Sequence, residues 1–501
     1  MTEHANGRND YERGSELAEA GRHEEALELI RRHLERHPGD AEAANDVGTL
    51  LYALGRFDEA ARQLHGVIEG PDCPPEALHN FAEAALVAGW PGEVSAAFGR
   101  MEAEGLLDAD LVNRTATAFL DSGDVPGAVE CLTRSLDMLP GQAVVLEPIL
   151  KNVLARRPKV AIFADRASDP DLADVHRFIS RRFETVGFFG LEATDASELG
   201  KALAWCDIAW LEGLGRRTAA VARADKMCRL VCRVRQSDVF GPETDGVPWE
   251  RFDAVFAAVN GTGLELLRRK APGVERLTKV VPVRRGVDLR RHAMRTGPRN
   301  KKLAWVSDIA DGANPGPLIQ CFAALREADD EYELHVAGAV ADDATAAYAM
   351  NLIHRLGLQE AIHFDGWQED LPAWLAEKDA VVHAGFADDV PLGVLQGMAR
   401  GLKPAVQYWP GAETVLDESH LFGTVSQFVS RIADEPYDPP AYRRFVEERY
   451  PLDAELDAVR GILEGFEAEP FTPSRPEPAA LATGPEEAAP ARIAQIEEVR
   501  T

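Results

Sequence analysis

The spacing of apolar residues changes near residue 158 and divides the chain into two parts. Before residue 140, large apolar side chains such as Leu27 and Ile30 recur three or four residues apart, the period of an amphipathic helix. Later, short apolar runs alternate with helix-like segments, at 159–164, 185–189, 206–211 and 229–234, then at 302–306, 333–338, 362–366, 380–384 and 404–407. This alternation predicts two parallel, Rossmann-like sheets covered on both faces, with a ligand crevice between them.

Small residues repeat along the helical part with a period of 34. One series is Gly21, Gly55, Gly89 and Gly123, and a second is Gly14, Gly48, Ala82 and Ala116. We expect the first series to break the chain between two helices and the second to let the helices pass closely. In these features residues 7–140 resemble tetratricopeptide repeats, which implies an α-solenoid over 7–150. Such an array leaves a groove that, in this family, holds a peptide or protein segment. The alternative is that the repeats only dimerise or brace the next domain.

The composition of the chain indicates some classes of protein and excludes others. A chain of 501 residues with 46% hydrophobic and 27% charged residues is globular and long enough for two or three domains. The net charge of -29 argues against general binding to nucleic acid or anionic membranes. The six cysteines contain no Cys-x-x-Cys and are expected to be reduced core thiols. The polar N-terminus and the lack of a run of 18 apolar residues predict a soluble, cytoplasmic protein without a transmembrane segment.

Residues 388–401 read Asp-Asp-Val-Pro-Leu-Gly-Val-Leu-Gln-Gly-Met-Ala-Arg-Gly. The segment resembles the nucleotide-sugar signature of retaining GT-B glycosyltransferases of family 4, in which a Glu, seven residues and a second Glu follow one another. Asp388 and Gln396 stand at the two Glu positions. Other segments typical of these enzymes follow in the same order, at 233–240, 249–256, 281–289, 305–309, 332–338, 356–367, 371–379 and 410–413. The resemblance therefore runs from about 158 to 465.

The resemblance implies an acceptor-side Rossmann-like domain at 158–290 and a nucleotide-sugar domain at 291–466. The Pro- and Ala-rich residues 467–501 are expected to form a disordered tail. By the same resemblance, the catalytic residues would be Asp388 and Arg235, the latter standing where many relatives place a His. The donor would lie beside Ser307, Asp308, Asn314, His383, Asp389, Val390, Pro391, Leu392 and Gln396.

The departures from the family pattern concern the diphosphate of the donor. Relatives stabilise its charge with an Arg and a Lys after the first strand of the second domain, together with a helix N-terminus. Here Asp308 stands at the Arg position, and Gly312 or Ala313 at the Lys position. Arg284 and Arg285 could reach the crevice instead, or could be exposed surface residues. The turn before Pro391 is expected to open a helix whose free N–H groups face the cleft. Lys403 and Glu413 belong to segments that border the donor site in relatives.

Three functions remain open. The first is a retaining glycosyltransferase that uses a nucleotide sugar, without metal or cofactor, on a protein acceptor recruited by the repeats. The second is a catalytically inactive, transferase-like scaffold. The third is a peptide-binding adaptor whose GT-B part serves as a dimerisation body, so homo-oligomerisation is also left open.

Overall fold

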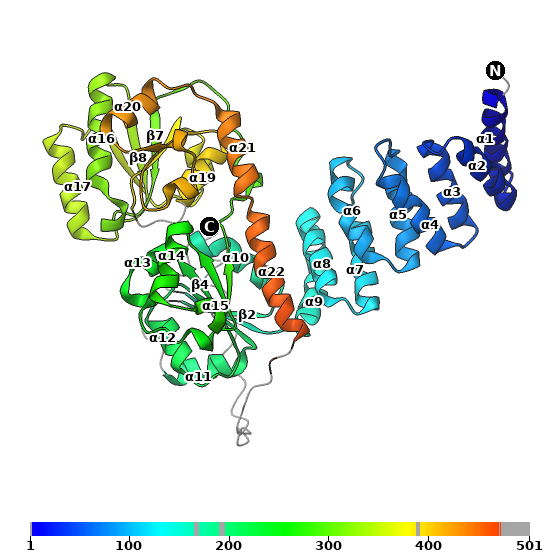
Figure 1. The fold of residues 1–501 in the computed structure, drawn as a ribbon, viewed down its shortest axis with the longest axis horizontal. Helices are drawn as coiled ribbons and strands as arrows, with labels where there is room; N and C mark the ends of the chain where they lie inside the picture. The colour runs from blue at the N-terminus through cyan, green and yellow to red at the C-terminus, as the bar shows by residue number, and fades with distance from the viewer. Residues whose placement is uncertain (1–2, 165–169, 190–195, 387–390, 470, 472–501) are drawn as a thin grey trace.

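A computed structural model describes residues 3–164, 170–189, 196–386, 391–469 and 471 (Figure 1). A helical array comes first along the chain, and two parallel sheets flanked by helices follow it. The expected class, an α-solenoid followed by two Rossmann-like domains, is confirmed.

The array consists of paired antiparallel helices with a final capping helix. Its members are α1 (Glu3–Glu19), α2 (His23–Arg36), α3 (Ala41–Ala53), α4 (Phe57–Ile68), α5 (Pro75–Ala88), α6 (Pro91–Ala103), α7 (Ala109–Ser122), α8 (Val125–Met138) and α9 (Ala143–Leu154). The glycines at 21, 55, 89 and 123 all have φ between 73° and 82° and end the first helix of each pair. A Cβ on Gly48 would lie 2.3 Å from Cγ of Leu64, so only glycine fits this helix crossing. Both glycine predictions are confirmed.

The first sheet has the order β2-β1-β3-β4-β5-β6 and is parallel throughout. Its strands are β1 (Val160–Ala164), β2 (Thr185–Phe189), β3 (Ile208–Glu212), β4 (Arg229–Arg235), β5 (Ala254–Ala258) and β6 (Lys279–Pro282). The connecting helices are α10 (Pro170–Ser180), α11 (Ala196–Trp205), α12 (Arg216–Arg223), α13 (Gln236–Phe240), α14 (Gly261–Lys270) and α15 (Val274–Leu277). The strand order reverses between β1 and β3, which places the expected crevice at the carboxyl ends of these strands.

The second sheet has the order β12-β11-β10-β7-β8-β9 and is also parallel. Its strands are β7 (Lys302–Val306), β8 (Glu333–Ala337), β9 (Ile362–Gly366), β10 (Ala380–His383), β11 (Lys403–Gln407) and β12 (Leu421–Phe422). Its helices are α16 (Pro315–Ala328), α17 (Asp343–Arg355), α18 (Leu371–Leu375), α19 (Leu392–Ala399), α20 (Val425–Ala433) and α21 (Pro439–Arg449). The strand order reverses between β7 and β10, so the loops after these strands border the crevice.

The last described helix, α22 (Leu452–Ala468), returns to the first sheet. Its buried residues Val459, Ile462 and Leu463 belong to the same core as Trp210 of β3. The expected boundary at 466 had placed this helix in the second domain. Apolar periodicity identifies the buried face of a helix but not the sheet that covers it, which explains the difference. Residues 467 and 468 end α22, and the rest of the expected tail, apart from 469 and 471, lies outside the described residues.

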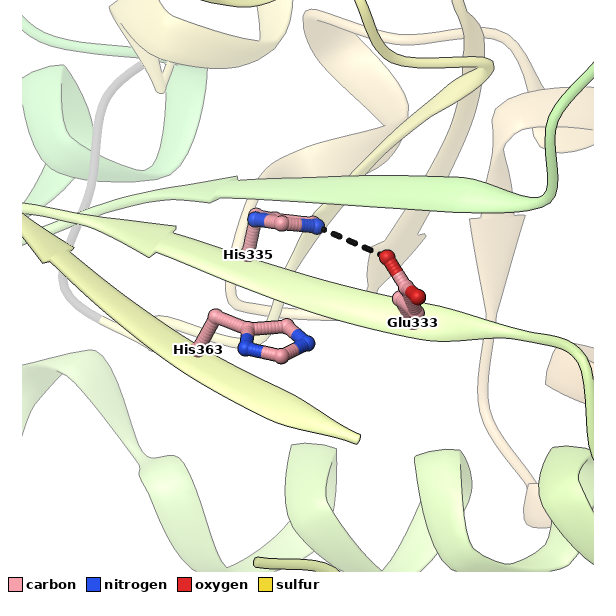
Figure 2. A group of neighbouring side chains, drawn as sticks. All are labelled: Glu333, His335 and His363. Carbon is pink, nitrogen blue, oxygen red and sulfur yellow. Dashed lines mark hydrogen bonds and ion pairs between the residues drawn. The ribbon is translucent and has the colours of Figure 1, made fainter. Parts of the chain in front are cut away.

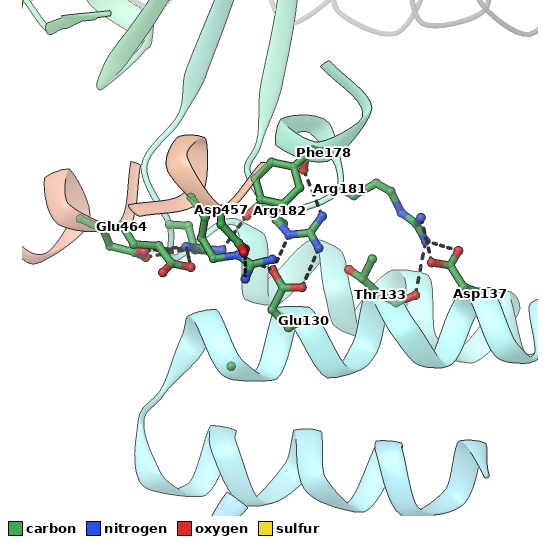
Figure 3. A network of polar contacts seen from close by, with 12 residues as sticks. Glu130, Thr133, Asp137, Phe178, Arg181, Arg182, Asp457 and Glu464 are labelled. Carbon is green, nitrogen blue, oxygen red and sulfur yellow. Dashed lines mark hydrogen bonds and ion pairs between the residues drawn. The ribbon is translucent and has the colours of Figure 1, made fainter. Parts of the chain in front are cut away.

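Arginines fix the solenoid to the first sheet domain (Figure 3). Arg182, just after α10, forms a bidentate pair with Glu130 of α8, and Arg460 of α22 lies 3.6 Å from the same carboxylate. Arg181 binds Asp137 at 2.6 Å. The last repeat therefore contacts two elements of the first sheet domain, which fixes the direction in which the solenoid leaves it.

Two expectations from the composition can also be compared with the structure. All six cysteines lie in the described part of the chain and are free, five of them buried and Cys73 half-buried. Among the described helices, none combines the length and the apolar character needed to cross a bilayer.

Candidate functional site

The loops after β7 and β8 lie backbone against backbone at the carboxyl edge of the second sheet. Ser307 N donates to Ala337 O at 2.9 Å, in register with the β7–β8 ladder. A Cβ on Gly338 would lie 2.1 Å from Ser307 O and 2.9 Å from Asp308 N. Because a side chain cannot fit there, Gly338 keeps the two loops in direct contact.

Asp308 occupies the position where relatives carry an arginine. Its Oδ1 accepts a hydrogen bond from Ala339 N at 2.8 Å, so the carboxylate caps the loop after β8. Residues 307–316 include no Lys or Arg. Any cation that balances a diphosphate here must therefore come from another segment.

Asn314 and His383 connect this loop to the neighbouring strand β10. Asn314 adopts a left-handed conformation at φ 54° and ψ 53°, and its Nδ2 donates to Ala384 O at 3.2 Å. His383, the last residue of β10, is only 4% exposed and faces the edge of the Trp409 ring, with centroids 6.4 Å apart. Nε1 of Trp409 has no hydrogen-bond partner among the described residues, although the ring is 4% exposed. The edge thus contains a buried donor close to His383.

The helix expected after Pro391 is present and begins at Leu392. Pro391 is the N-cap of α19, and its carbonyl accepts from Val394 N at 2.9 Å, which leaves the N–H groups of Leu392 and Gly393 without partners within the helix. A Cβ on Gly393 would lie 2.5 Å from Cβ of Val306, which places the start of α19 directly against the end of β7. Gln396 lies half-buried in the second turn. Asp388, Asp389 and Val390 lie outside the described residues.

On the facing side of the crevice, Arg235 ends β4 and is held by its own domain. Its backbone N donates to Asp238 Oδ2 at 2.8 Å, and its Nη2 lies 3.4 Å from Asp238 Oδ1. The guanidinium also packs on Gly213, where a Cβ would lie 2.6 Å from Nη2. Arg284 is exposed and Arg285 half-buried in the segment that joins the two sheets.

The two domains touch at a contact that the sequence did not predict. Asn260 caps α14 through Gly263 N, and its Nδ2 donates to Pro410 O at 3.0 Å across the crevice. Gly411, at φ 91°, lies close to the same amide, and a Cβ at this position would be only 2.5 Å from it. In the sequence, the dipeptides Asn-Gly and Pro-Gly at these positions indicate two turns, but not that the turns meet. Glu413, in the same loop, is exposed.

The expectation for Lys403 is wrong. This residue begins β11 and therefore lies at the amino edge of the sheet, away from the loops just described. Its Nζ donates to Glu435 O at 2.6 Å, and burial lowers the pKa of its ammonium to about 8. Its proximity in sequence to the signature does not reflect proximity in space, because a whole strand separates it from the carboxyl edge.

At this edge the structure therefore assembles Ser307, Asp308, Asn314, His383, Pro391, Leu392 and Gln396 around the ends of β7 and β10. The edge offers free backbone N–H groups of α19, a side-chain amide and a buried indole N–H. Such groups can bind an anionic or hydroxyl-rich ligand.

Comparison with known proteins supports both parts of the architecture. Residues 300–434 match the family model described as "Glycosyl transferases group 1", and residues 11–64 match "Tetratricopeptide repeat". Among curated proteins, none has a sequence that matches this chain significantly.

Several solved structures are similar to the chain in fold. HepE from Anabaena, solved in complex with UDP and glucose, superposes with a TM-score of 0.51 at 15% identity, over 62% of this chain and 100% of HepE. Sucrose-phosphate synthase from Thermosynechococcus elongatus gives 0.49 at 12% identity, over 62% and 100%. The pneumococcal O-GlcNAc transferase GtfA, with UDP and GlcNAc, gives 0.45 at 14% identity, over 56% and 60%. The chain thus carries N-terminal tetratricopeptide repeats and a C-terminal glycosyltransferase-like GT-B fold.

Proposed function

We propose that this chain is a retaining glycosyltransferase that takes a sugar from a nucleotide sugar and transfers it to a protein acceptor recruited by the repeats. The observation that carries the proposal is the carboxyl edge of the second sheet. There, Gly338 and Gly393 remove every side chain from the places where the backbone approaches β7. The chain also resembles in fold HepE, which was solved in complex with UDP and glucose, and this likeness supports a nucleotide-sugar donor.

The donor would lie across the start of α19. Its diphosphate would accept hydrogen bonds from the N–H groups after Pro391, where the helix dipole favours an anion. The amide of Gln396 would bind the ribose hydroxyls as a neutral substitute for a carboxylate. Arg284 and Arg285 would supply the charge that residues 307–316 lack, and Asp388 would lie beside the transferred sugar. No metal or cofactor is needed in this scheme.

The repeats would bind the acceptor as an extended segment. Asn80 of α5 donates from Nδ2 to Asn45 Oδ1 of α3 at 3.0 Å, and Asn113 of α7 donates to Gln142 at 3.0 Å. Asn45, Asn80 and Asn113 lie on α3, α5 and α7, and Gln142 lies just before α9. Amide side chains offer both donors and acceptors to a peptide backbone, which favours a polypeptide over a purely apolar partner.

A binding and transfer assay tests the proposal. The full chain would be screened by saturation-transfer NMR against nucleotide sugars with uracil, guanine and adenine bases, and then incubated with donors that bind and with protein extracts as acceptors. We expect one base to be preferred, and Gln396→Ala to weaken that donor about tenfold through loss of the ribose contacts. Folded protein that binds none of the donors would contradict the proposal.

A catalytically inactive scaffold is the second candidate, and Asp308 favours it. Its carboxylate replaces a cation next to the diphosphate position and would repel the donor at short range. The two candidates differ in the Asp388→Ala variant. A transferase loses glycan transfer while keeping donor binding, whereas a scaffold shows no transfer with or without the substitution.

A further inference from the structure

The second sheet carries a polar cluster on a face that parallel sheets normally bury under apolar helices. On this face α18 and α19 cover β7, β10 and β11 with apolar side chains such as Leu375 and Val394. The two outer strands, β8 and β9, instead present Glu333, His335, His363 and Asp365. These residues alternate with core residues of the opposite face, as strand geometry requires.

Strand pairing brings the donor atoms of this cluster together. His335 and His363 are register partners, and their rings stack with centroids 4.7 Å apart and an interplanar angle of 26°. Glu333 precedes His335 by two residues and points to the same side, as Figure 2 shows. One ligand atom from each of the three side chains lies within 4.8 Å of the other two.

The orientation of His335 is fixed by a carboxylate on the far side of its ring. Nδ1 of His335 lies 3.0 Å from Oδ2 of Asp365, and Nε1 of Trp374 donates to the same oxygen at 2.7 Å. With Nδ1 held against this carboxylate, Nε2 is the ring nitrogen that points toward Glu333. A carboxylate that holds a histidine in this way is the usual second-sphere partner of a metal-bound imidazole.

The ring nitrogen Nε2 of His335 and the carboxylate of Glu333 point toward each other. Oε2 of Glu333 lies 3.2 Å from Nε2 of His335. A carboxylate oxygen and an imidazole nitrogen that converge in this way can both bind one cation. The distance is close to the roughly 3.4 Å that separates two ligands of a tetrahedral Zn²⁺ with bonds of about 2.1 Å.

We propose that Glu333, His335 and His363 form a binding site for a divalent transition metal, with Zn²⁺ as the best-fitting ion. Two imidazoles and one carboxylate are a borderline-soft ligand set that suits Zn²⁺, and a water molecule would complete the tetrahedron. Asp365 is a positioning residue that orients His335. The site joins β8 to the edge strand β9 and, through Trp374, to α18. It lies away from the donor edge and is independent of the proposed transfer reaction.

The ammonium of Lys302 competes with the metal ion for the carboxylate of Glu333. Its Nζ lies 3.5 Å from Glu333 Oε2, and its side chain is 33% exposed, so it can swing into solvent when a metal binds. The arrangement predicts that removing this ammonium increases the affinity for the metal.

Calorimetric titration of the EDTA-treated full chain with Zn²⁺, together with Co²⁺ absorption spectra, tests the proposal. We expect one tight Zn²⁺ per chain and the intense visible bands of tetrahedral Co²⁺. His335→Gln and His363→Gln should each weaken this binding about a hundredfold, Asp365→Asn about tenfold, and Lys302→Met should tighten it a few-fold. His354→Gln, on an exposed histidine of α17 in the same domain, is the matched control and should bind like the parent.

Two results would overturn the site. The first is an isotherm that is the same in His335→Gln, His363→Gln and the parent, which would assign the metal to other histidines. The second is no binding of Zn²⁺ or Co²⁺ to the folded, metal-free chain, which would leave the cluster as a hydrogen-bonded group that only joins β8, β9 and α18. If His335→Gln fails to fold, Asp365→Asn and Lys302→Met still test the site, because they should change the affinity for the metal in opposite directions.

Discussion

A buried charge network in the first sheet differs from the polar groups at the carboxyl edge and outer strands of the second sheet. In the first sheet, Arg233 of β4 is 2% exposed and donates from Nε to Glu212 at 2.9 Å and from Nη1 to Glu455 of α22 at 2.7 Å. The second oxygen of Glu455 accepts from Gly286 N at 2.9 Å. This network joins β3, β4, α22 and the segment that leads to the second domain.

In the second sheet, polar groups remain available. Nε1 of Trp409 has no partner among the described residues, the N–H groups of Leu392 and Gly393 have none within α19, and Nε2 of His335 points toward the carboxylate of Glu333. Polar groups that are fully paired hold a fold together, whereas groups that are positioned but unsatisfied indicate a ligand. The comparison therefore assigns a structural role to the Arg233 network of the first sheet and supports our proposal that the polar groups of the second sheet bind ligands.

The largest expected effect is on the buried network of the first sheet. Glu455→Ala leaves Arg233 with one carboxylate and Gly286 N without an acceptor, and should cost about 3–5 kcal/mol of unfolding free energy. Urea unfolding followed by fluorescence measures this loss. Glu447→Ala removes an exposed partner of Arg443 and should cost less than about 0.5 kcal/mol. Equal losses in the two variants would contradict a special role for the buried pair.

A second prediction concerns the carboxyl edge of the second sheet. Gly338→Ala forces a Cβ into the backbone of Ser307 and should cost about 1–3 kcal/mol of stability. It should also weaken a bound nucleotide sugar about tenfold or more, because the loops that carry the ligand separate. Gly312→Ala is the control at the same edge, since a Cβ there meets no atom within 4 Å. Donor affinity that survives Gly338→Ala unchanged would place the ligand elsewhere.

Acid should weaken the second domain through His420. Burial among Tyr442 and Phe445 lowers the pKa of this histidine to about 4, below its ordinary value of about 6.5. The unfolded chain therefore binds the proton first, so stability is complete above about pH 6.5 and is lost as the pH falls toward 4. At pH 5 the loss from this group is about 2 kcal/mol.

Thermal unfolding at pH 5 and pH 8 checks this sign. His420→Phe should reduce the difference between the two pH values by about 2 kcal/mol, whereas His354→Gln should leave it unchanged. A difference that His420→Phe does not alter would assign the acid sensitivity to other groups, such as His292, whose pKa burial also lowers to about 4.

The smallest expected effect is at the junction of the solenoid. Arg182→Ala removes the bidentate pair with Glu130 and should cost about 1 kcal/mol, because both groups are partly exposed. Small-angle scattering should then show a broader range of solenoid positions. Arg177→Ala removes an exposed pair with Asp174 on the same helix α10 and should leave the scattering curve unchanged.

The sequence predicted the helices and strands better than it predicted the contacts between distant segments. The glycines at 34-residue spacing and the apolar runs were placed correctly because burial and turn geometry leave a direct periodic signal. Three strands were not predicted. They are β5, a run of small apolar residues, and the edge strands β6 and β12, which are only four and two residues long.

Contacts between distant segments left no such signal. The pairing of His335 with His363 depends on strand register across an intervening helix, and the contact of Asn260 with Pro410 depends on how the domains meet. The structure brings the predicted segments 307–314 and 391–396 together at the carboxyl edge of the second sheet, and their role in binding a donor stays a prediction. Lys403 lies at the opposite edge, because sequence proximity does not distinguish the two ends of a strand.

Hydrogen exchange measured with and without a nucleotide sugar tests the central claim most directly. The account predicts that the donor slows exchange in peptides covering 337–341 and 391–396, where the loops and the start of α19 would bind it, and leaves the Arg233 network of β3 and β4 unchanged. No protection with any donor, or protection confined to the first sheet, would contradict the assignment of binding to the second.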